Sequence, residues 1–157
     1  FLDKAFGSAR APMRKFYVLI AGGGKPAVSK DMIRVMYGLL KEARQATTDP
    51  RVMERLDDLV LYTRYVELFR TYKKTHFFGR QAAFEAMMRH AYRMRKRMMV
   101  HTKGLYKSVL RRDKRIVVPP EAGIEVPEPR NPWKAGGDYR REEIEAMLSR
   151  GLDAEAP

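Results

Sequence analysis

Apolar side chains recur three and four positions apart as far as about Leu110, a spacing that places them on one face of a helix. The segment after Ser29 shows this period most clearly. Ser29 is a residue type that caps helix N-termini, and Asp31 in the first turn suits the helix dipole. The pattern therefore predicts a helix that begins directly after Ser29. Its apolar residues are Met32, Ile33, Met36, Tyr37, Leu40 and Ala43.

Two further helices are predicted on either side of this one. The first covers roughly residues 9–21 and ends at Gly22-Gly23-Gly24-Lys25-Pro26, because glycine and proline both stop helices. The other begins at Pro50, a residue suited to the first helical position, with Asp49 as its cap. It continues to about Lys74, and its wide apolar surface favours a central position in the fold.

The next predicted helix follows a break at residues 76–79. It begins at about Arg80 and ends at His101 or, as an alternative, at Leu110. Such a methionine-rich helix is typical of adaptable core packing. The residues of its apolar stripe are Phe84, Met87, Met88, Ala91, Met94 and Met98.

The character of the sequence changes after Arg115. Prolines at positions 119, 120, 127 and 129 predict an extended arm. A short helix at residues 139–150 is predicted to follow the arm, with Asp138 as its cap and Gly151 as its end.

These elements predict an all-α fold: a bundle of three to four long helices with an extended Pro-rich arm and a short C-terminal helix. The predicted domains are a helical bundle over 1–115 and, over 116–157, the arm and short helix, leading to a further domain. With 157 residues and 45% hydrophobic content, the chain can bury such a core. No apolar run approaches the roughly 20 residues of a membrane span, so no membrane partner is expected. Because the chain begins with Phe1, we expect an internal fragment or a processed product.

The net charge of +13 is concentrated in one segment. Residues 89–115 contain eleven Lys and Arg residues against one carboxylate, Asp113, whereas the chain from Ile116 onward is acidic. Three interpretations remain open: a solvated helix face, contact with an acidic domain of the same polypeptide, and binding of nucleic acid or another anionic polymer.

No catalytic, cofactor-binding or metal-binding residues are predicted. The Gly-rich stretch at 22–25 lacks the Ser or Thr of a phosphate-binding loop, since proline follows it. His90 and His101 would lie about 16 Å apart along a helix, too far to share a metal ion. The absence of cysteine excludes disulfides and thiol chemistry. One acidic cluster lies in the first turns of a helix, where carboxylates ordinarily complement the dipole; it consists of Glu54, Asp57 and Asp58.

Segments along nearly the whole chain carry a resemblance to a known family. They are residues 6–17, 49–52, 55–68, 90–95, 98–102, 131–134 and 142–144. Together they resemble the helical region that follows the barrel in bacterial alpha-glucuronidase-like glycoside hydrolases. The resemblance implies an upstream (β/α)₈ barrel that holds the acid/base carboxylates, so that no catalytic residue would lie in this chain. It also implies a bacterial protein that is secreted or periplasmic.

We therefore predict a non-catalytic accessory module that packs against the upstream barrel domain of the same polypeptide and helps to shape carbohydrate binding, with a polysaccharide as a further partner. The alternative function is binding of nucleic acid or an anionic polymer by the basic surface 89–115. No cofactor is expected for either function. The predicted interface or ligand contacts are Arg89, His90, Tyr92, Arg93, Arg97, His101 and Tyr106.

Overall fold

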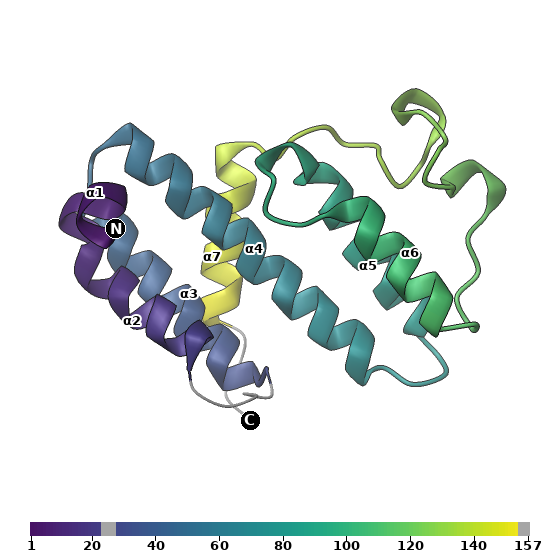
Figure 1. Cartoon of the computed structure of the whole chain (residues 1–157), viewed down its shortest axis with the longest axis horizontal. Coiled ribbons are helices and arrows are strands. Elements are labelled where there is room, and N and C mark those ends of the chain that lie inside the picture. Colours follow the sequence, from purple (N-terminus) through teal and green to yellow (C-terminus); the bar gives the residue numbers. More distant parts are fainter. Residues whose placement is uncertain (23–27, 154–157) are drawn as a thin grey trace. The chain divides into compact units, whose positions relative to one another are not determined.

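The computed structural model describes residues 1–22 and 28–153 of the chain (Figure 1). All regular elements in these ranges are helices, which confirms the predicted all-α class. None of these helices has the length and apolar character that crossing a membrane requires. Most of the Gly-Lys-Pro stretch that is predicted to stop the first helix lies outside the described residues. The prediction that this stretch is not a phosphate-binding loop lies outside them as well.

The chain forms two compact units. Unit 1 consists of residues 1–66 together with 140–157, and unit 2 consists of residues 67–139. The longest helix, α4 (Pro50–Lys74), contributes its first part to unit 1 and its last part to unit 2. The predicted domains, 1–115 and 116–157, concern the native polypeptide and stay a prediction.

In unit 1, α2 packs against α3, and α3 also packs against α7 (Figure 1). Two of the predicted caps are confirmed here. The Ser29 hydroxyl accepts a hydrogen bond from the Met32 amide at 3.0 Å, and the Asp49 carboxylate accepts one from the Arg51 amide at 2.8 Å. The helices of unit 1, apart from the first part of α4, are α1 (Leu2–Phe6), α2 (Arg10–Ala21), α3 (Lys30–Gln45) and α7 (Arg141–Asp153), with a 3₁₀ turn, η1 (Gly7–Ala9), between α1 and α2.

The prediction that Gly151 ends the last helix is wrong, because α7 continues to Asp153. Gly151 is buried where α7 meets α3, and a Cβ atom at this position would overlap the ring of Tyr37. The glycine therefore serves the close approach of two helices. Asp138 is not the cap of this helix either: Glu143 accepts the hydrogen bond from the Arg140 amide, at 3.0 Å.

Unit 2 packs the end of α4, α5 and α6 around an aromatic and methionine core. The arm, residues 116–139, lies along these helices and adds Trp133 to the core, where its ring meets Phe84 edge to face at 5.7 Å between centroids. Figure 1 shows α5 and α6 side by side, with the arm passing over them. The elements of unit 2 are α5 (Arg80–Arg93), η2 (Arg95–Arg97), α6 (Thr102–Arg112), η3 (Pro120–Ala122) and η4 (Glu128–Arg130).

The prediction of one helix from Arg80 to His101 or Leu110 is also wrong. The helix ends at Arg93, and the chain turns back through η2 and through Met98, whose φ of 58° is left-handed. Thr102 then begins α6, and its hydroxyl lies 3.2 Å from the carbonyl oxygen of Ala91. The first five residues of the predicted stripe are buried as expected, whereas Met98 is 89% exposed because it lies in the turn.

Candidate interaction site

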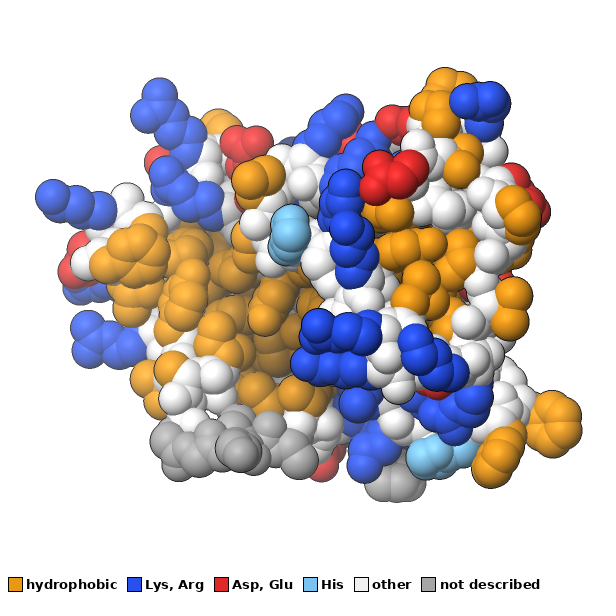
Figure 2. All heavy atoms as spheres, turned by 45° about the vertical axis from the view of Figure 1, so that its right-hand side comes forward, with side chains coloured by type: hydrophobic (Ala, Val, Ile, Leu, Met, Phe, Trp, Pro, Cys, Tyr) orange, Lys and Arg blue, Asp and Glu red, His pale blue; other side chains and the backbone are white. Residues whose placement is uncertain are grey.

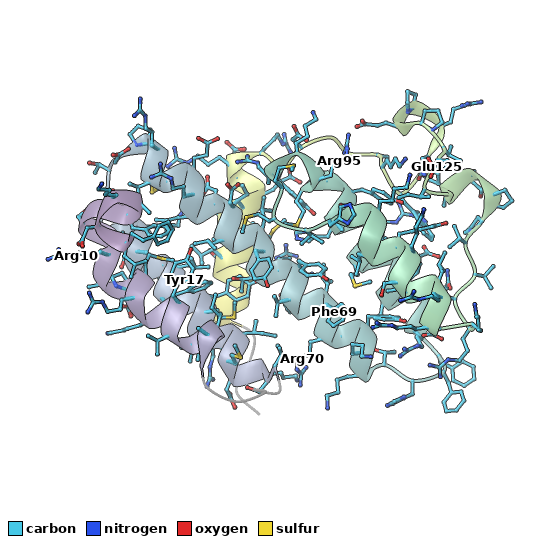
Figure 3. The ribbon with its side chains drawn as sticks, in the orientation of Figure 1. Arg10, Tyr17, Phe69, Arg70, Arg95 and Glu125 are labelled. Carbon is cyan, nitrogen blue, oxygen red and sulfur yellow. The ribbon has the colours of Figure 1, made fainter. Side chains whose placement is uncertain are left out.

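The first part of the basic segment binds the arm of the same unit. Arg89 donates to the carbonyl oxygen of Pro132 at 2.6 Å, and Arg93 donates to that of Gly137 at 3.1 Å. The Arg93 guanidinium also stacks on the Tyr139 ring, 3.8 Å from its centroid. Figure 3 labels Arg95 near the end of α5 and Glu125 on the arm. The ion pairs between the two segments are Arg95–Glu128, Lys96–Asp138 and Lys103–Glu125.

These contacts account for much of the charge between Arg89 and Lys103. The acidic arm supplies carboxylates to three of the six cations in this half of the basic segment, and its backbone carbonyls accept hydrogen bonds from two more. Exposed ion pairs of this kind contribute little to stability individually. The break after Arg93 also removes Arg97 from the face that Arg89 and Arg93 share on α5.

The seven predicted contact residues have different surroundings in unit 2. Three of them are buried: His90, Tyr92 and Tyr106. His90 makes a 2.7 Å hydrogen bond to the Tyr139 hydroxyl. His101 is exposed and its ring lies against Gly104. Contact of these seven residues with a barrel or a carbohydrate stays a prediction.

The end of the basic segment lies beside an exposed loop that carries two aromatic side chains. We define the loop end of unit 2 as residues 72–81 and 111–117, where the end of α4, the start of α5 and the end of α6 meet. Phe77 and Phe78, in the turn between α4 and α5, are 81% and 98% exposed. Phe77 has a left-handed φ of 45°, a conformation that costs free energy for a bulky side chain. Two adjacent, fully exposed phenylalanines are unusual on a surface that contacts only water.

A buried polar network holds the base of this loop in place. Arg80 is its centre: its Nε donates to Asp113 at 2.5 Å, and one terminal nitrogen donates to the carbonyl oxygens of Tyr72 and Thr75 at 2.9 and 2.7 Å. The Tyr72 hydroxyl donates to the same Asp113 oxygen at 2.8 Å. Side chains with several such bonds keep one conformation, so the loop that carries the two phenyl rings is fixed at both ends.

Asp113 is the acceptor for three side chains, and its ionisation follows from them. Burial alone would raise the pKa of Asp113, but hydrogen bonds from Arg115, Arg80 and Tyr72 outweigh burial and hold the pKa far below its usual value. The network therefore favours the charged form of the carboxylate.

Acid is expected to weaken unit 2 through this group. A carboxyl whose pKa is depressed in the folded state stabilises the fold above its unfolded pKa of about 3.9, and this contribution is lost as the pH falls towards the folded pKa. We expect the urea-unfolding free energy to fall more between neutral pH and about pH 3 in the wild type than in an Asp113→Asn variant. Equal losses in both proteins would contradict this assignment.

The loop end is strongly basic around the two rings. It contains seven Lys and Arg residues against one carboxylate, and that carboxylate is the buried Asp113. On the face that Figure 2 shows, blue Lys and Arg side chains far outnumber red Asp and Glu side chains. Val117 is 68% exposed and adds a further apolar group. The side chain of Gln81 holds Val117 in place, because it accepts a hydrogen bond from the Val117 backbone amide and donates one to the Val117 carbonyl oxygen. The exposed cations of the loop end are Lys73, Lys74, Arg111, Arg112, Lys114 and Arg115.

Our sequence interpretation missed the phenylalanines and the two lysines before them. It treated residues 76–79 only as a break between helices. The available signal was the pair Phe77-Phe78 directly before Gly79: large apolar residues inside a turn have no helix face on which to be buried.

The described residues contain no group of three His, Asp or Glu side chains that could hold a metal ion. The acidic cluster of α4 has a structural partner, since Asp57 forms an ion pair with Arg44 of α3. Arg55, which lies between these acids on α4, donates to the carbonyl oxygen of Ala5 at 2.7 Å.

Comparison of the chain with protein-family models, with curated proteins and with solved structures gives no match. The resemblance to alpha-glucuronidase-like proteins therefore stays a prediction from the sequence. What defines a candidate site is the geometry of the loop end: two exposed aromatic rings on a fixed turn, surrounded by cations.

Proposed function

We propose that this chain is a non-catalytic helical accessory module of a larger glycoside-hydrolase-like protein and that it packs against the barrel domain of that protein. The observation that supports this proposal is the exposure of Phe77 and Phe78 on a turn fixed by Arg80 and Asp113. Rigid exposed aromatic side chains are typical anchors of protein interfaces, where they fill pockets on the partner.

The energetics favour a protein partner for these rings. Burial of one Phe side chain contributes about 1.5–3 kcal/mol, so two rings that enter an apolar pocket supply a central anchor. The cations around them would form a polar rim that meets carboxylates on the partner. The partner that we propose is the barrel domain that the resemblance in the sequence implies.

The mass of the native polypeptide tests the first part of the proposal. An antibody raised against this 157-residue chain is expected to detect a polypeptide several times heavier than 18.2 kDa in a source extract. Detection of a band near 18.2 kDa alone would reject the accessory-module function.

Radical footprinting tests the docking surface separately. Phe77 and Phe78 are expected to be oxidised readily in the isolated 157-residue chain and to be protected several-fold in the native polypeptide. Met98 is an internal reference of similar exposure in the same unit, outside the loop end. A heavy native polypeptide in which both phenylalanines react as fast as in the isolated chain would reject the loop end while leaving the module assignment intact.

Nucleic-acid binding is a second candidate function because exposed aromatic rings next to cations also suit stacking on unpaired bases. The cations that this function would use are those of the loop end, since the acidic arm engages the earlier half of the segment. If the chain binds single-stranded DNA in this way, the double variant Arg111→Gln with Arg112→Gln is expected to lower the slope of log binding constant against log salt concentration by about 1.4. The charge-matched control, Lys30→Gln with Lys41→Gln on α3, should leave this slope unchanged. Undetectable binding at low salt would reject this candidate.

A further inference from the structure

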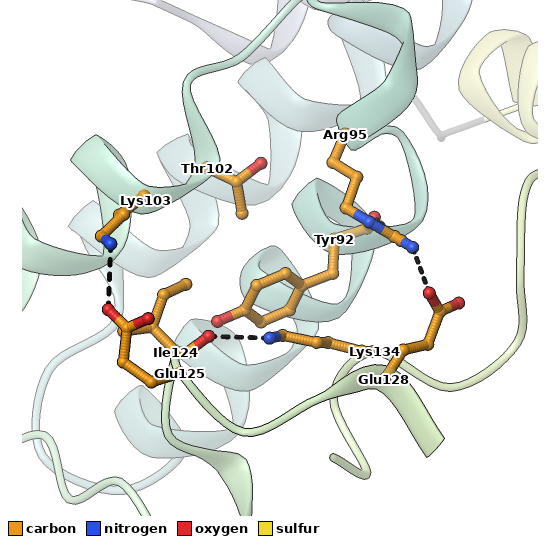
Figure 4. Close-up of a pocket in the computed structure, with 8 residues that line it drawn as sticks. All are labelled: Tyr92, Arg95, Thr102, Lys103, Ile124, Glu125, Glu128 and Lys134. Atoms are coloured by element: carbon orange, nitrogen blue, oxygen red, sulfur yellow. Dashed lines mark hydrogen bonds and ion pairs between the residues drawn. The ribbon is translucent and has the colours of Figure 1, made fainter. Parts of the chain in front are cut away.

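Residues 124–130 of the arm lie over a cavity of about 390 Å³ in unit 2 (Figure 4). We define this segment as the lid. Ile124, Glu125 and Glu128 of the lid line one side of the cavity, and residues of α5, η2 and α6 line the other. The lid therefore spans an open space instead of packing closely on the helices, so few dispersion contacts hold it there.

Both ends of the lid are anchored by buried residues of the arm. Ala122 precedes the lid, and Asn131 and Trp133 follow it; all three are buried. The side-chain nitrogen of Asn131 donates to the carbonyl oxygen of Gly123 at 2.8 Å, which joins the residues before and after the lid. The lid is therefore a loop whose two ends are held together on a fixed base.

The backbone of the lid forms no hydrogen bond with α5, η2 or α6 in the part of the chain that the structure describes. Its hydrogen bonds stay within the arm. The Val126 amide donates to the carbonyl oxygen of Gly123 at 3.0 Å, and the Lys134 ammonium group donates to the carbonyl oxygens of Ile124 and Val126 at 2.7 and 2.6 Å. The lid can therefore move away from the helices without breaking a backbone hydrogen bond to them.

Two ion pairs connect the lid to the helices across the cavity. Glu128 pairs with Arg95 of η2, and Glu125 pairs with Lys103 of α6 at 2.9 Å. The side chains of Lys103 and Glu125 are 52% and 76% exposed, so water and salt screen this pair. The forces that close the lid are therefore weak and depend on ionic strength.

The closed lid also covers a polar group that has no protein partner. Tyr92 is 1% exposed, and its hydroxyl forms no hydrogen bond with any of the described residues. Figure 4 shows the hydroxyl directed towards Ile124 and Glu125 of the lid. Burial of an unpaired hydroxyl costs free energy, and water satisfies the hydroxyl once the lid moves away. Closure thus gains two weak ion pairs and loses the hydration of one hydroxyl, two contributions of opposite sign and similar size.

We propose that the lid opens over the cavity while its buried anchors stay in place, and that ionic strength sets the fraction of time for which it is open. In the open state Glu125 and Glu128 are solvated, and water reaches the Tyr92 hydroxyl. Rising salt weakens the closed state, because only that state contains the two ion pairs. The lid is independent of the proposed function, since it lies outside the loop end.

A single cysteine under the lid measures its opening, because the chain contains no cysteine of its own. Thr102→Cys places a thiol in the lining of the cavity, at a position that is 9% exposed. Uncharged iodoacetamide should alkylate this thiol about two- to fivefold faster at about 0.5 M than at about 0.05 M sodium chloride. The same ratio for Met98→Cys, an exposed site in unit 2, corrects for effects of salt on the reagent. A corrected ratio of one or below would overturn the proposal.

The fluorescence of Trp133 shows whether the anchor of the lid stays in place. The sequence contains one tryptophan, so acrylamide quenching of the emission reports on Trp133 alone. We expect this quenching to stay constant over the range of salt that speeds alkylation. Quenching that rises in parallel with alkylation would mean that the whole arm leaves the core, and it would overturn the lid.

Two variants in the Thr102→Cys background test the ion pair. Lys103→Gln and Glu125→Gln break the same pair, so each should raise the alkylation rate, up to about fivefold. Their direct effects on the reactive thiolate are opposite, because one variant removes a cation and the other a carboxylate. Rates that change in opposite directions would therefore reject the lid and leave only a local effect of charge on the thiol.

A third variant in the same background, Tyr92→Phe, tests the opposing contribution. It removes the hydroxyl whose burial disfavours closure, so it should lower the alkylation rate about three- to tenfold. Tyr17→Phe in unit 1 is the control and should leave the rate unchanged. A rate in Tyr92→Phe that is unchanged or higher would contradict the proposed balance between closed and open states.

Radical footprinting of the unsubstituted chain repeats the test without a change at Thr102, whose hydroxyl donates to the carbonyl oxygen of Ala91. Oxidation of Tyr92 should increase with salt, whereas oxidation of Trp133 should not. An equal response of the two residues to salt, or no response of either, would reject the lid.

Discussion

Replacement of Asp113 by alanine is expected to destabilise unit 2 by about 3–5 kcal/mol, because it leaves Arg80 buried without its counter-charge. The side chains of both residues are at most 10% exposed, so water cannot replace the lost partner. The Tyr72 hydroxyl also loses its acceptor. Urea unfolding followed by circular dichroism measures the effect. Because the same network fixes the aromatic turn, we expect protease access at residues 75–79 to rise in this variant.

Two controls separate the buried network from charge in general. Asp138→Ala removes an exposed ion pair with Lys96 and should cost less than about 1 kcal/mol. The double variant Arg80→Met with Asp113→Leu removes both buried charges together and should recover part of the lost stability, since an apolar pair can replace a buried ion pair. A double variant less stable than Asp113→Ala, or an Asp113→Ala protein as stable as the wild type, would show that the network does not act as an ion pair.

Replacement of Trp133 by alanine is expected to cost about 3–5 kcal/mol, the range for large aromatic residues removed from a core. Trp133 is 2% exposed and packs edge to face on Phe84, and its backbone amide donates to the side-chain oxygen of Asn131 at 2.9 Å. It is the largest of the buried side chains that the arm contributes to unit 2. We therefore expect Trp133→Ala to release the arm before α5 and α6 unfold.

Hydrogen exchange measures the two effects of Trp133→Ala separately. Amides of residues 122–134 should exchange faster in the variant, whereas those in the middle of α5 should change less. Trp133→Phe, which keeps an aromatic ring in the core, is the matched control and should lie between the wild type and the alanine variant. Uniformly faster exchange throughout unit 2 would mean that arm and helices unfold as one body.

Local features of the sequence were sufficient to predict most helices of the chain. The hydroxyl of Ser29 and the carboxylate of Asp49 define helix starts within one turn, so their effect does not depend on distant residues. The period of apolar residues in α3 and α4 likewise predicts buried faces that the structure confirms. Where two signals competed, the prediction failed: residues 94–101 have helical propensity, but packing of α6 back onto α5 breaks the helix there.

The sequence predicted how many charged residues the basic segment and the arm contain, but not which of them form ion pairs. The sequence alone shows a basic segment followed by an acidic arm, and both segments are close together along the chain. Which cation meets which carboxylate depends on how the arm folds back, and Trp133 decides that by entering the core. The pairing leaves the cations after Lys103 at the loop end, beside two phenylalanines to which the sequence interpretation assigned no role.

The sequence by itself determined the all-α class, the helix caps at Ser29 and Asp49, the basic excess and the absence of cysteine chemistry, because each depends on residue type and short-range spacing. Tertiary structure alone decided the turn after Arg93, the buried Arg80–Asp113 pair and the burial of Tyr92. It also assigned Gly151 to helix packing rather than to a helix end. The physical reason is that burial and pairing are properties of atoms brought together from distant positions, and no local pattern specifies which atoms those are.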